Sequence, residues 1–384
     1  MTALLAPDPA LPQRDALLDE RYMAGVLGAG RCERINAKYR VGDSLRVVYR
    51  LDDARIVAWR TFGAQSASVY RRAAARTPDG VLHAEPLSTV FWRFPHDRRL
   101  AGLRLLDDRA ALGELLGGPV ARTRLMAYAP ERAATAECLD EGGTVMAYVK
   151  VHWDAAEREL ANAEAAAAAV GTGDPHLRLP RVLAASLPDG ALALEPIPGD
   201  RLDGLRDLTP ALHALGAALA TLHDVRPLPA RRFDRLDPDR LALAAEVVGR
   251  ARPGCAQVAD ALLQRLADGP PESEPVHLHG DANLRNALLD GERVGLVDLE
   301  DATAGPPAAD LGFVLAGLLT RAEQGAALLD GYARIARVPS DEALRWHTAA
   351  SLLARIAVPA VGRVRPALLR RLGVLLREAG ELVA

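Results

Sequence analysis

The chain has 384 residues, 49% of them hydrophobic, which is enough apolar material for the cores of two or three domains. Its net charge of −3 and its pI near 6.3 exclude the strongly basic composition that is typical of nucleic-acid and membrane-surface binding. Three scattered cysteines, Cys32, Cys138 and Cys255, favour reduced thiols over a disulfide framework or a zinc site.

Location can also be predicted from composition. Residues 1–8 lack the basic segment and the sustained apolar stretch of a signal peptide, and no apolar run reaches the length of a membrane span. We therefore expect a cytoplasmic protein without nucleic-acid or membrane partners, as a monomer or a homodimer. Only two lysines, Lys38 and Lys150, occur among the 47 Lys and Arg residues, so each retained lysine is a candidate for a role that arginine cannot fill.

The first hundred residues predict strands over 38–51 and 55–60, followed by a helix at about 65–76. Residues 125–170 repeat this order of elements: Tyr128 falls near Tyr39, Leu139 near Leu51, and Lys150 near Arg60. The sequence identity between the two segments is thin. The pattern is compatible with a degenerate duplication of one hairpin unit.

Strands are predicted at 125–132, at 133–139 and at 145–151, the last of which contains Lys150. A helical segment follows at about 154–170, and a further strand at 191–195 ends at a Pro- and Gly-containing linker that marks a boundary between lobes. Beyond the linker, the spacing of leucines and alanines predicts a mostly helical region. Its expected helices cover 209–223, 239–267, 307–335, 341–357 and 366–382.

The most informative segment runs from His279 to Glu300. Residues 287–289 and 294–297 read as short strands, and Asp290-Gly291 between them is a strong hairpin signal. Such a hairpin would bring Asn286 and Asp298 to one open end, with Asp281 in the approaching loop. An oxygen-only cluster of this kind suits a hard cation such as Mg²⁺. The alternative is that these Asp and Gly residues are ordinary turn formers.

His279-Gly280-Asp281 with Asn286 and Asp298 resembles the aminoglycoside phosphotransferase and choline kinase family, whose loop reads His-Gly-Asp-x-His-x-x-Asn. The resemblance covers roughly residues 120–384. It implies a bilobal, protein-kinase-like α+β fold with a β-rich N-lobe and a mostly helical C-lobe. Asp281 would be the catalytic acid–base residue, and Asn286 and Asp298 the metal ligands, with Glu300 as a further carboxylate at the metal.

Nucleotide-binding residues follow from the same resemblance, which implies ATP and Mg²⁺ as cofactors. Lys150 would steady the phosphates and pair with a Glu of the following helix, for which Glu164 has the spacing closest to that of the family. Glu195 and Ile197, at the linker, would meet the adenine edge through their backbone groups. One departure is Asn283, which stands where many relatives carry a second His.

Two further side chains are expected to brace the structure. Asp310 would either hold the catalytic loop through backbone hydrogen bonds, as in the family, or simply interact with the dipole of the helix that it begins. His279 is expected to pack under the loop rather than to carry a proton.

The resemblance also divides the chain. We expect an N-terminal cap subdomain over 1–105, similar to that of maltokinases and related sugar kinases, a nucleotide-binding N-lobe over 106–198, and a C-lobe over 199–384. The predicted function is phosphorylation of a hydroxyl group of a small molecule, with a sugar or aminosugar as first choice.

Two alternatives stay open. One is an aminoglycoside or other antibiotic as the acceptor, for which Glu300, Asp301, Asp200 and Asp203 could supply an acidic pocket. The other is a nucleotide-binding regulatory pseudokinase. The sequence leaves open the acceptor, the hydroxyl that is phosphorylated, and the preference for ATP or GTP.

Overall fold

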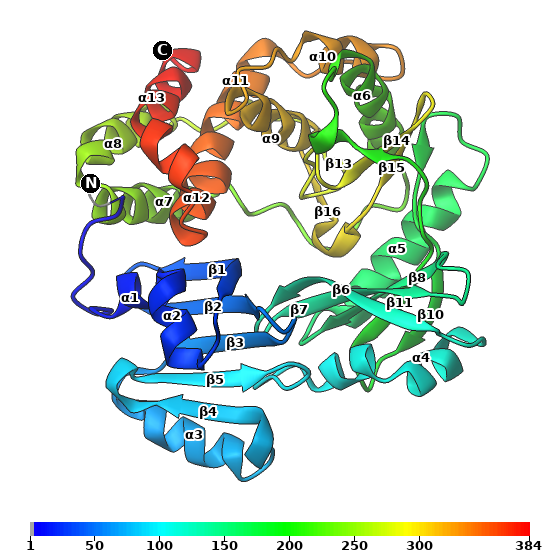
Figure 1. The fold of residues 1–384 in the computed structure, drawn as a ribbon. Coiled ribbons are helices and arrows are strands. Elements are labelled where there is room, and N and C mark those ends of the chain that lie inside the picture. The colour runs from blue at the N-terminus through cyan, green and yellow to red at the C-terminus, as the bar shows by residue number, and fades with distance from the viewer. Residues whose placement is uncertain (1–3) are drawn as a thin grey trace.

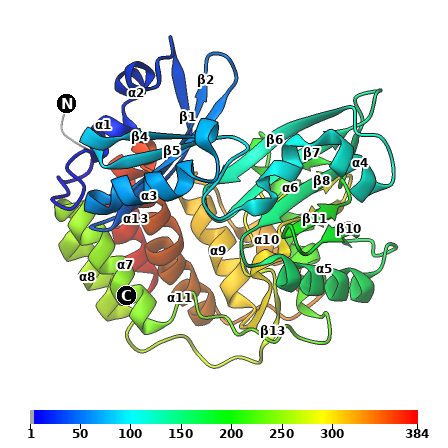
Figure 2. The same cartoon turned by 90° about the horizontal axis from the view of Figure 1, so that it is seen from below.

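A computed structural model describes residues 4–384, and residues 1–3, which belong to the segment without a signal-peptide pattern, lie outside it. The chain has the expected α+β fold. Two antiparallel sheets lie side by side on one side of the molecule, and most of the helices form the other side (Figures 1 and 2). Within residues 4–384, every helix is too short or too polar to cross a bilayer.

The first sheet has the strand order β1-β2-β3-β5-β4 and contains residues of the first hundred only. Its strands are β1 (Cys32–Arg40), β2 (Ser44–Leu51), β3 (Ile56–Thr61), β4 (Val81–Ala84) and β5 (Thr89–Arg93). Helices α1 (Arg14–Leu18) and α2 (Glu20–Leu27) precede it, and α3 (Ser66–Ala74) lies between β3 and β4.

The second sheet has the order β6-β7-β8-β11-β10 and forms the N-lobe beside the catalytic region. Its strands are β6 (Arg122–Ala129), β7 (Ala133–Leu139), β8 (Val145–His152), β10 (Val182–Ser186) and β11 (Ala191–Leu194). Helix α4 (Arg109–Leu116) precedes the sheet, and α5 (Ala156–Val170) follows β8.

The two sheets have the same topology. Each is an antiparallel three-stranded meander, then a helix, then a hairpin whose second strand pairs with the third strand of the meander. The helices before them match as well: α2 and α4 each begin after an Asp cap, Asp19 and Asp108, and each end at a left-handed glycine, Gly28 and Gly117. This agreement supports the duplication that the sequence suggested.

A hydrogen-bonded triad repeats in the same place. Tyr39 in β1 donates to Asp8 at 2.6 Å, and Tyr128 in β6 donates to Asp97 at 2.7 Å, with 31 positions between the partners in both cases. Each Asp also accepts the backbone N–H of the following turn, from Gly42 at 2.8 Å and from Glu131 at 3.0 Å. Both turn residues have positive φ. The two units therefore share backbone geometry and a buried polar anchor.

The helical part contains the C-terminal half of the chain. Its helices are α6 (Thr209–His223), α7 (Pro238–Ala251), α8 (Ala256–Arg265), α9 (Ala308–Leu319), α10 (Ala326–Ala333), α11 (Asp341–Ser351), α12 (Val358–Gly362) and α13 (Pro366–Leu382), which confirms the predicted helical segments. A π-helix, Leu352–Ala357, joins α11 to α12. Short 3-10 helices include η4 (Ala101–Asp107) and η7 (Leu299–Asp301).

Two small sheets carry the segments in which the sequence predicts the catalytic and metal-binding residues. One contains β12 (Asp200–Arg201), β14 (Ala287–Asp290), β15 (Arg293–Leu296) and β9 (Leu177–Arg178), and the other pairs β13 (Val276–Leu278) with β16 (Thr303–Gly305). The predicted hairpin is confirmed, with Asp290 opposite Arg293 and Gly291 at φ 62° in the turn.

The core of the first sheet is shared with the C-terminal helices. Trp59 and Tyr49 are fully buried in one apolar cluster with Leu353 of the π-helix and Leu369 of α13. The opposite face of the first sheet, including Val48 and Ala58, packs into the core of the second sheet. Burial of this apolar area fixes the first sheet against both the N-lobe and the C-terminal helices.

Candidate active site

The hairpin β14–β15 places two of the expected metal ligands at one end. Asn286 precedes β14 and Asp298 follows β15, and the N–H of Val297 donates to the carbonyl of Asn286 at 3.0 Å. Asp298 adopts φ 70°, which is uncommon for a residue other than glycine and is found at functional sites more often than elsewhere.

Asp281 is held by three side chains. The amide nitrogens of Asn283 and Asn286 each lie 3.3 Å from its Oδ2, and Nη2 of Arg355 lies 3.1 Å from its Oδ1. Burial raises the pKa of Asp281, although the positive charge of Arg355 acts in the opposite direction. A carboxylate with raised basicity suits a group that must accept a proton.

Gly280 is required by the close approach of the catalytic loop to η7. It has φ 76°, and a Cβ at this position would lie 1.9 Å from the carbonyl oxygen of Asp301. Any larger residue would push the two segments apart. Loop and hairpin are therefore locked together around the site.

Asp310 braces the catalytic loop, as the family resemblance implied. It accepts the backbone N–H groups of His279 at 2.7 Å and of Gly280 at 3.0 Å, and it is fully buried. Nε2 of His279 lies 2.9 Å from the carbonyl oxygen of Val297. His223, on α6, lies 3.4 Å from Asp310 and 2.9 Å from the hydroxyl of Tyr332, so it belongs to the same support.

Lys150 lies at the centre of an acidic cluster, with only 11% of its side chain exposed. Its Nζ is 2.5 Å from Asp298, 3.1 Å and 3.2 Å from the two oxygens of Glu159, and 3.1 Å from Glu300. Burial by itself would lower the pKa of Lys150, but these three carboxylates together raise it. The ammonium group is therefore charged and fixed beside Asp298.

The partner of Lys150 on α5 is Glu159, and the expectation of Glu164 is wrong. Ala156, Glu159, Ala163 and Ala166 form the buried face of α5, whereas Glu164 is exposed. Five residues of α-helix rotate a side chain by about 140°. Glu164 therefore points away from the sheet that carries Lys150.

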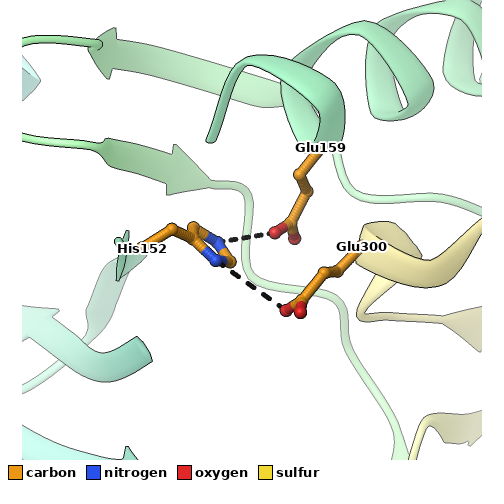
Figure 3. A group of neighbouring side chains, drawn as sticks. All are labelled: His152, Glu159 and Glu300. Carbon is orange, nitrogen blue, oxygen red and sulfur yellow. Dashed lines mark ion pairs between the residues drawn. The ribbon is translucent and has the colours of Figure 1, made fainter. Parts of the chain in front are cut away.

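Figure 3 shows that His152, Glu159 and Glu300 point toward one another. Both carboxylates also contact Lys150. Nε2 of His152 is 2.6 Å from Glu159, and its Nδ1 is 3.8 Å from Glu300. The three ligand atoms are close enough for a metal ion, but the ammonium group of Lys150 already lies 3.1 Å from both Glu159 Oε2 and Glu300 Oε2. The cluster therefore positions a lysine. Sequence reasoning missed His152, although it follows Lys150 by two positions on the same face of a strand.

Arg132 brings the β6–β7 turn to the site. Its Nη2 lies 2.7 Å from Glu300. Burial by itself would raise the pKa of Glu300, but the charges of Lys150 and Arg132 lower it to about 2.

Glu131, the residue before Arg132, binds three arginines. They are Arg46 at 3.1 Å and Arg60 at 2.5 Å, both of the first sheet, and Arg98. The first sheet thereby anchors the turn that carries Arg132.

The linker after β11 is available for a nucleotide base. The carboxylate of Glu195 pairs with Arg178 and Arg181, both at 3.1 Å, so its side chain is occupied. The carbonyl of Glu195 and the N–H of Ile197 have no backbone partner among residues 4–384. Ile197 packs directly on β15: a Cβ added at Gly295 would lie 2.3 Å from Cγ2 of Ile197.

Arg355, which sequence reasoning also missed, lies in the π-helix. Its Nη2 donates to the carbonyl of Gly280 at 2.7 Å, and its guanidinium stacks 3.4 Å from the ring centre of Phe313. Nη1 is buried and has no hydrogen-bond partner among residues 4–384. A π-helical turn frequently marks a functional position, and here it aims an arginine at Asp281.

The donor set fits a magnesium–nucleotide complex. Asn286 uses its amide nitrogen for Asp281, and within residues 4–384 no donor contacts its Oδ1. Asp298 supplies carboxylate oxygens, and its pKa is lowered because Lys150 outweighs the effect of burial. Oxygen ligands from one carboxylate and one amide, completed by phosphate oxygens, are typical of Mg²⁺ sites.

Solved structures share the fold. Spectinomycin phosphotransferase APH(9)-Ia, in complex with ADP and spectinomycin, aligns with a TM-score of 0.52 at 12% identity, covering 73% of this chain and 96% of that chain. A choline/ethanolamine kinase family protein from Mesorhizobium loti aligns with a TM-score of 0.52 at 18% identity, covering 73% and 93%. The GDP and kanamycin complex of APH(2″)-IIIa gives 0.51 at 13% identity, covering 70% and 96%.

No curated protein sequence matches the chain significantly. The sequence model of the phosphotransferase enzyme family (APH), by contrast, matches residues 140–347, a segment that includes Lys150, Glu159, Asp281, Asn286 and Asp298. This match spans more than half of the chain and contains both halves of the site. The chain therefore belongs to the phosphotransferase enzyme family and is a small-molecule phosphotransferase with a hydroxyl acceptor.

Proposed function

We propose that the chain transfers the γ-phosphoryl group of ATP, in the presence of Mg²⁺, to a hydroxyl group of a sugar or sugar derivative. One observation supports this more than any other. Lys150 joins Glu159 of α5 to Asp298 within 3.2 Å, while Asn286 of the same hairpin end donates to Asp281. The proposed phosphate-binding cation thus contacts one proposed metal ligand, and the proposed general base contacts the other.

Each group has a distinct role in the proposal. Asp281 orients the acceptor hydroxyl and takes its proton, and Arg355 holds Asp281 in place. Asp298 and Asn286 would hold Mg²⁺, with Glu300 as a nearby carboxylate, and the ion would neutralise charge on the phosphates. Lys150 would contact the phosphates. The carbonyl of Glu195 and the N–H of Ile197 would form hydrogen bonds with the nucleotide base. Positioning and charge neutralisation supply most of the rate in such transfers.

An aminoglycoside is a less suitable acceptor. The acidic residues that could form a pocket for its amino groups are mostly paired within the chain. Asp301 pairs with Arg235 and with Arg231, Asp203 with Arg201 at 2.9 Å, and Glu300 with Arg132 at 2.7 Å. These carboxylates are therefore not available to a polycation.

The test compares wild type with Asp281→Asn in a coupled ATPase assay with a panel of sugars, and measures nucleotide binding by thermal shift. We expect the variant to lose turnover by about 10²- to 10⁴-fold, the usual contribution of a general base, while the shift with MgATP is retained. The wild-type rate should fall as the pH drops through the raised pKa of Asp281.

Two results would overturn the proposal. Undiminished turnover by Asp281→Asn would remove the assigned base. A thermal shift with MgATP but no acceptor-dependent turnover for any member of the panel would favour the regulatory pseudokinase instead.

A further inference from the structure

Five cations from four separate segments form a connected series of charged neighbours that reaches Asp281 through Arg363. Lys38 belongs to β1, Arg132 to the β6–β7 turn, and Arg285 to the catalytic loop, while Arg363 and Arg365 follow α12. Arg363 has Asp281, Arg285 and Arg132 among its charged neighbours, and Lys38 has Arg132 and Arg363. The first sheet, the N-lobe and the C-terminal helices all contribute to this group, which we name the basic cluster.

Backbone contacts hold these segments together. A Cβ on Gly362, which precedes Arg363, would lie 3.2 Å from the carbonyl oxygen of Tyr39, which follows Lys38. Arg132 is fixed to Glu300 at 2.7 Å, and Arg355, seven positions before Gly362, is fixed to Asp281 at 3.1 Å. The basic cluster is therefore tied to the catalytic carboxylate by the π-helix and α12.

Most of this positive charge is not neutralised. Within residues 4–384, no ion pair involves Lys38, Arg363 or Arg365, and Arg285 reaches Asp203 only at 3.6 Å. Two acidic neighbours of Arg132 are already paired with other cations, Asp301 with Arg235 and Glu300 with Lys150. The chain as a whole carries a net charge of −3, so the cluster does not reflect a generally basic surface.

Desolvation and repulsion between like charges lower the pKa values of members of the basic cluster. Partial desolvation by the surrounding protein, with the charges of Arg132, Arg40 and Arg46, lowers the pKa of Lys38 to about 8, although its side chain stays exposed. Desolvation, with the charges of Arg285 and Arg363, lowers the pKa of Arg365 to about 10. Cations that the fold holds close together, although this lowers their pKa values, are typical of an anion-binding site.

The turn that carries the two arginines is strained. Val364, between them, has φ 47°, a conformation that is a genuine outlier for a β-branched residue. Its side chain is buried, so the core holds the turn in this shape and keeps Arg363 and Arg365 on either side of it.

We propose that the basic cluster binds the acceptor, and that the acceptor is an anionic polyhydroxy compound that carries a carboxylate or a phosphate besides the hydroxyl that is phosphorylated. This inference rests on the proposed function and narrows it, since it excludes the aminosugars. Arginine forks and an ammonium group are the usual ligands of carboxylates and phosphates. The anionic group would lie toward β1 and α12, with the reacting hydroxyl at Asp281.

The experiment uses four acceptors that share a six-carbon skeleton and differ in charge: glucose, glucosamine, gluconate and glucose 6-phosphate. The proteins are wild type, the double variant Arg363→Gln/Arg365→Gln, and the control Arg76→Gln. Arg76 is an exposed arginine that follows α3, far from α12 (Figure 1). Initial rates give kcat and KM for the acceptor and for ATP, and calorimetry measures binding of each acceptor to the protein saturated with MgADP.

We expect gluconate or glucose 6-phosphate to exceed glucose and glucosamine in kcat/KM, and the choice between the two anions identifies the anionic group. The double variant should raise KM for the anionic acceptor by about tenfold or more, the usual loss for one charge-assisted hydrogen bond, with KM for ATP unchanged. The control should leave both values unchanged.

Several results would overturn the inference. They are a preference for glucose or glucosamine, an unchanged KM of the double variant for the anion, or a rise in its KM for ATP alone, which would assign the cluster to the nucleotide. Failure of the proposed function is distinguishable, because it would abolish turnover with every acceptor. In that case calorimetry still decides the inference: weaker binding of the anion by the double variant than by the control supports it, and equal binding overturns it.

Discussion

The first and second sheets share one topology but carry different side chains at matching positions. Arg60 of β3 lies opposite Arg46 of β2, and Lys150 of β8 lies opposite Thr135 of β7, so Arg60 and Lys150 occupy matching positions in the two meanders. In both units the helix begins six positions later, at Ser66 and at Ala156. The fourth helical residue is buried Val69 in the first unit and Glu159 in the second.

This difference shows that the shared fold does not by itself provide the ion-paired lysine that we propose for nucleotide binding. Lys150 has Glu159 on its helix and Asp298 on the catalytic hairpin as partners. Arg60 has no carboxylate at the corresponding helical position, and it binds Glu131 from the turn of the second unit. A site on a shared frame is defined by specific side chains. The first unit instead supports the second through the ion pairs of Arg46 and Arg60 with Glu131.

Within this comparison of the two units, the largest effect is expected between Lys150→Met and Arg60→Met. Loss of Lys150 removes a preorganised positive charge, so kcat/KM should fall by about 10²- to 10³-fold. Arg60→Met should keep kcat/KM within a few-fold, because Glu131 retains Arg46 and Arg98, and should instead lower thermal stability. Steady-state kinetics and calorimetric melting measure both. Equal loss of activity in the two variants would mean that the units are functionally equivalent.

A second comparison tests which carboxylate of α5 positions Lys150. Glu159→Gln weakens the ion pair at 3.1 Å and should reduce kcat/KM by about 10- to 100-fold through misplacement of the lysine. Glu164→Gln, on the exposed side of the same helix, is the matched control and should behave as wild type. A loss of activity in Glu164→Gln but not in Glu159→Gln would show that Glu164, and not Glu159, positions Lys150.

The only two lysines of the chain allow a test by chemical labelling over a pH series. The surrounding protein and neighbouring arginines lower the pKa of Lys38 to about 8, so above that pH it is neutral, exposed and nucleophilic. Lys150 is buried among carboxylates that raise its pKa, so it should resist acetylation throughout. Mass spectrometry of the two peptides that contain Lys38 and Lys150 measures the extent of acetylation of each lysine. Labelling of Lys150 before Lys38 in the folded protein would contradict the described environments.

The smallest expected effect concerns the repeated Tyr–Asp anchor. Tyr39→Phe and Tyr128→Phe each remove a hydrogen bond to a carboxylate, at 2.6 Å and 2.7 Å, and each should lower the free energy of unfolding by about 1.5–3 kcal/mol. The two losses should be similar and nearly additive, because the anchors share no partner. Denaturant titrations measure them, and a loss confined to one variant would show that only one anchor matters.

Sequence reasoning predicted the catalytic hairpin because its signals are local. Asp281, Asn286 and Asp298 lie within eighteen positions of one another, Gly291 allows the turn, and strand alternation sets the register. The helices from 209 onward were predicted for the same reason, since each carries its own apolar periodicity.

The remaining parts of the site depend on contacts between distant segments. Lys150 and Asp298 are 148 positions apart, Arg132 and Glu300 are 168 apart, and Arg355 and Asp281 are 74 apart. No local pattern links these residues, so the roles of Arg132 and Arg355 were not predicted. The choice between Glu159 and Glu164 depends on how α5 is rotated against the sheet, and packing sets that rotation.

The amino-acid sequence by itself determined the class of reaction, because the catalytic loop and hairpin are contiguous and their spacing fixes their chemistry. Only the tertiary structure decided which charges meet. It paired Lys150 with Glu159, turned Arg60 toward Glu131, and gathered Lys38, Arg363 and Arg365 from opposite ends of the chain. Such choices follow from burial of apolar faces on the two sheets and the C-terminal helices, which sets the distance between charged groups far apart in sequence.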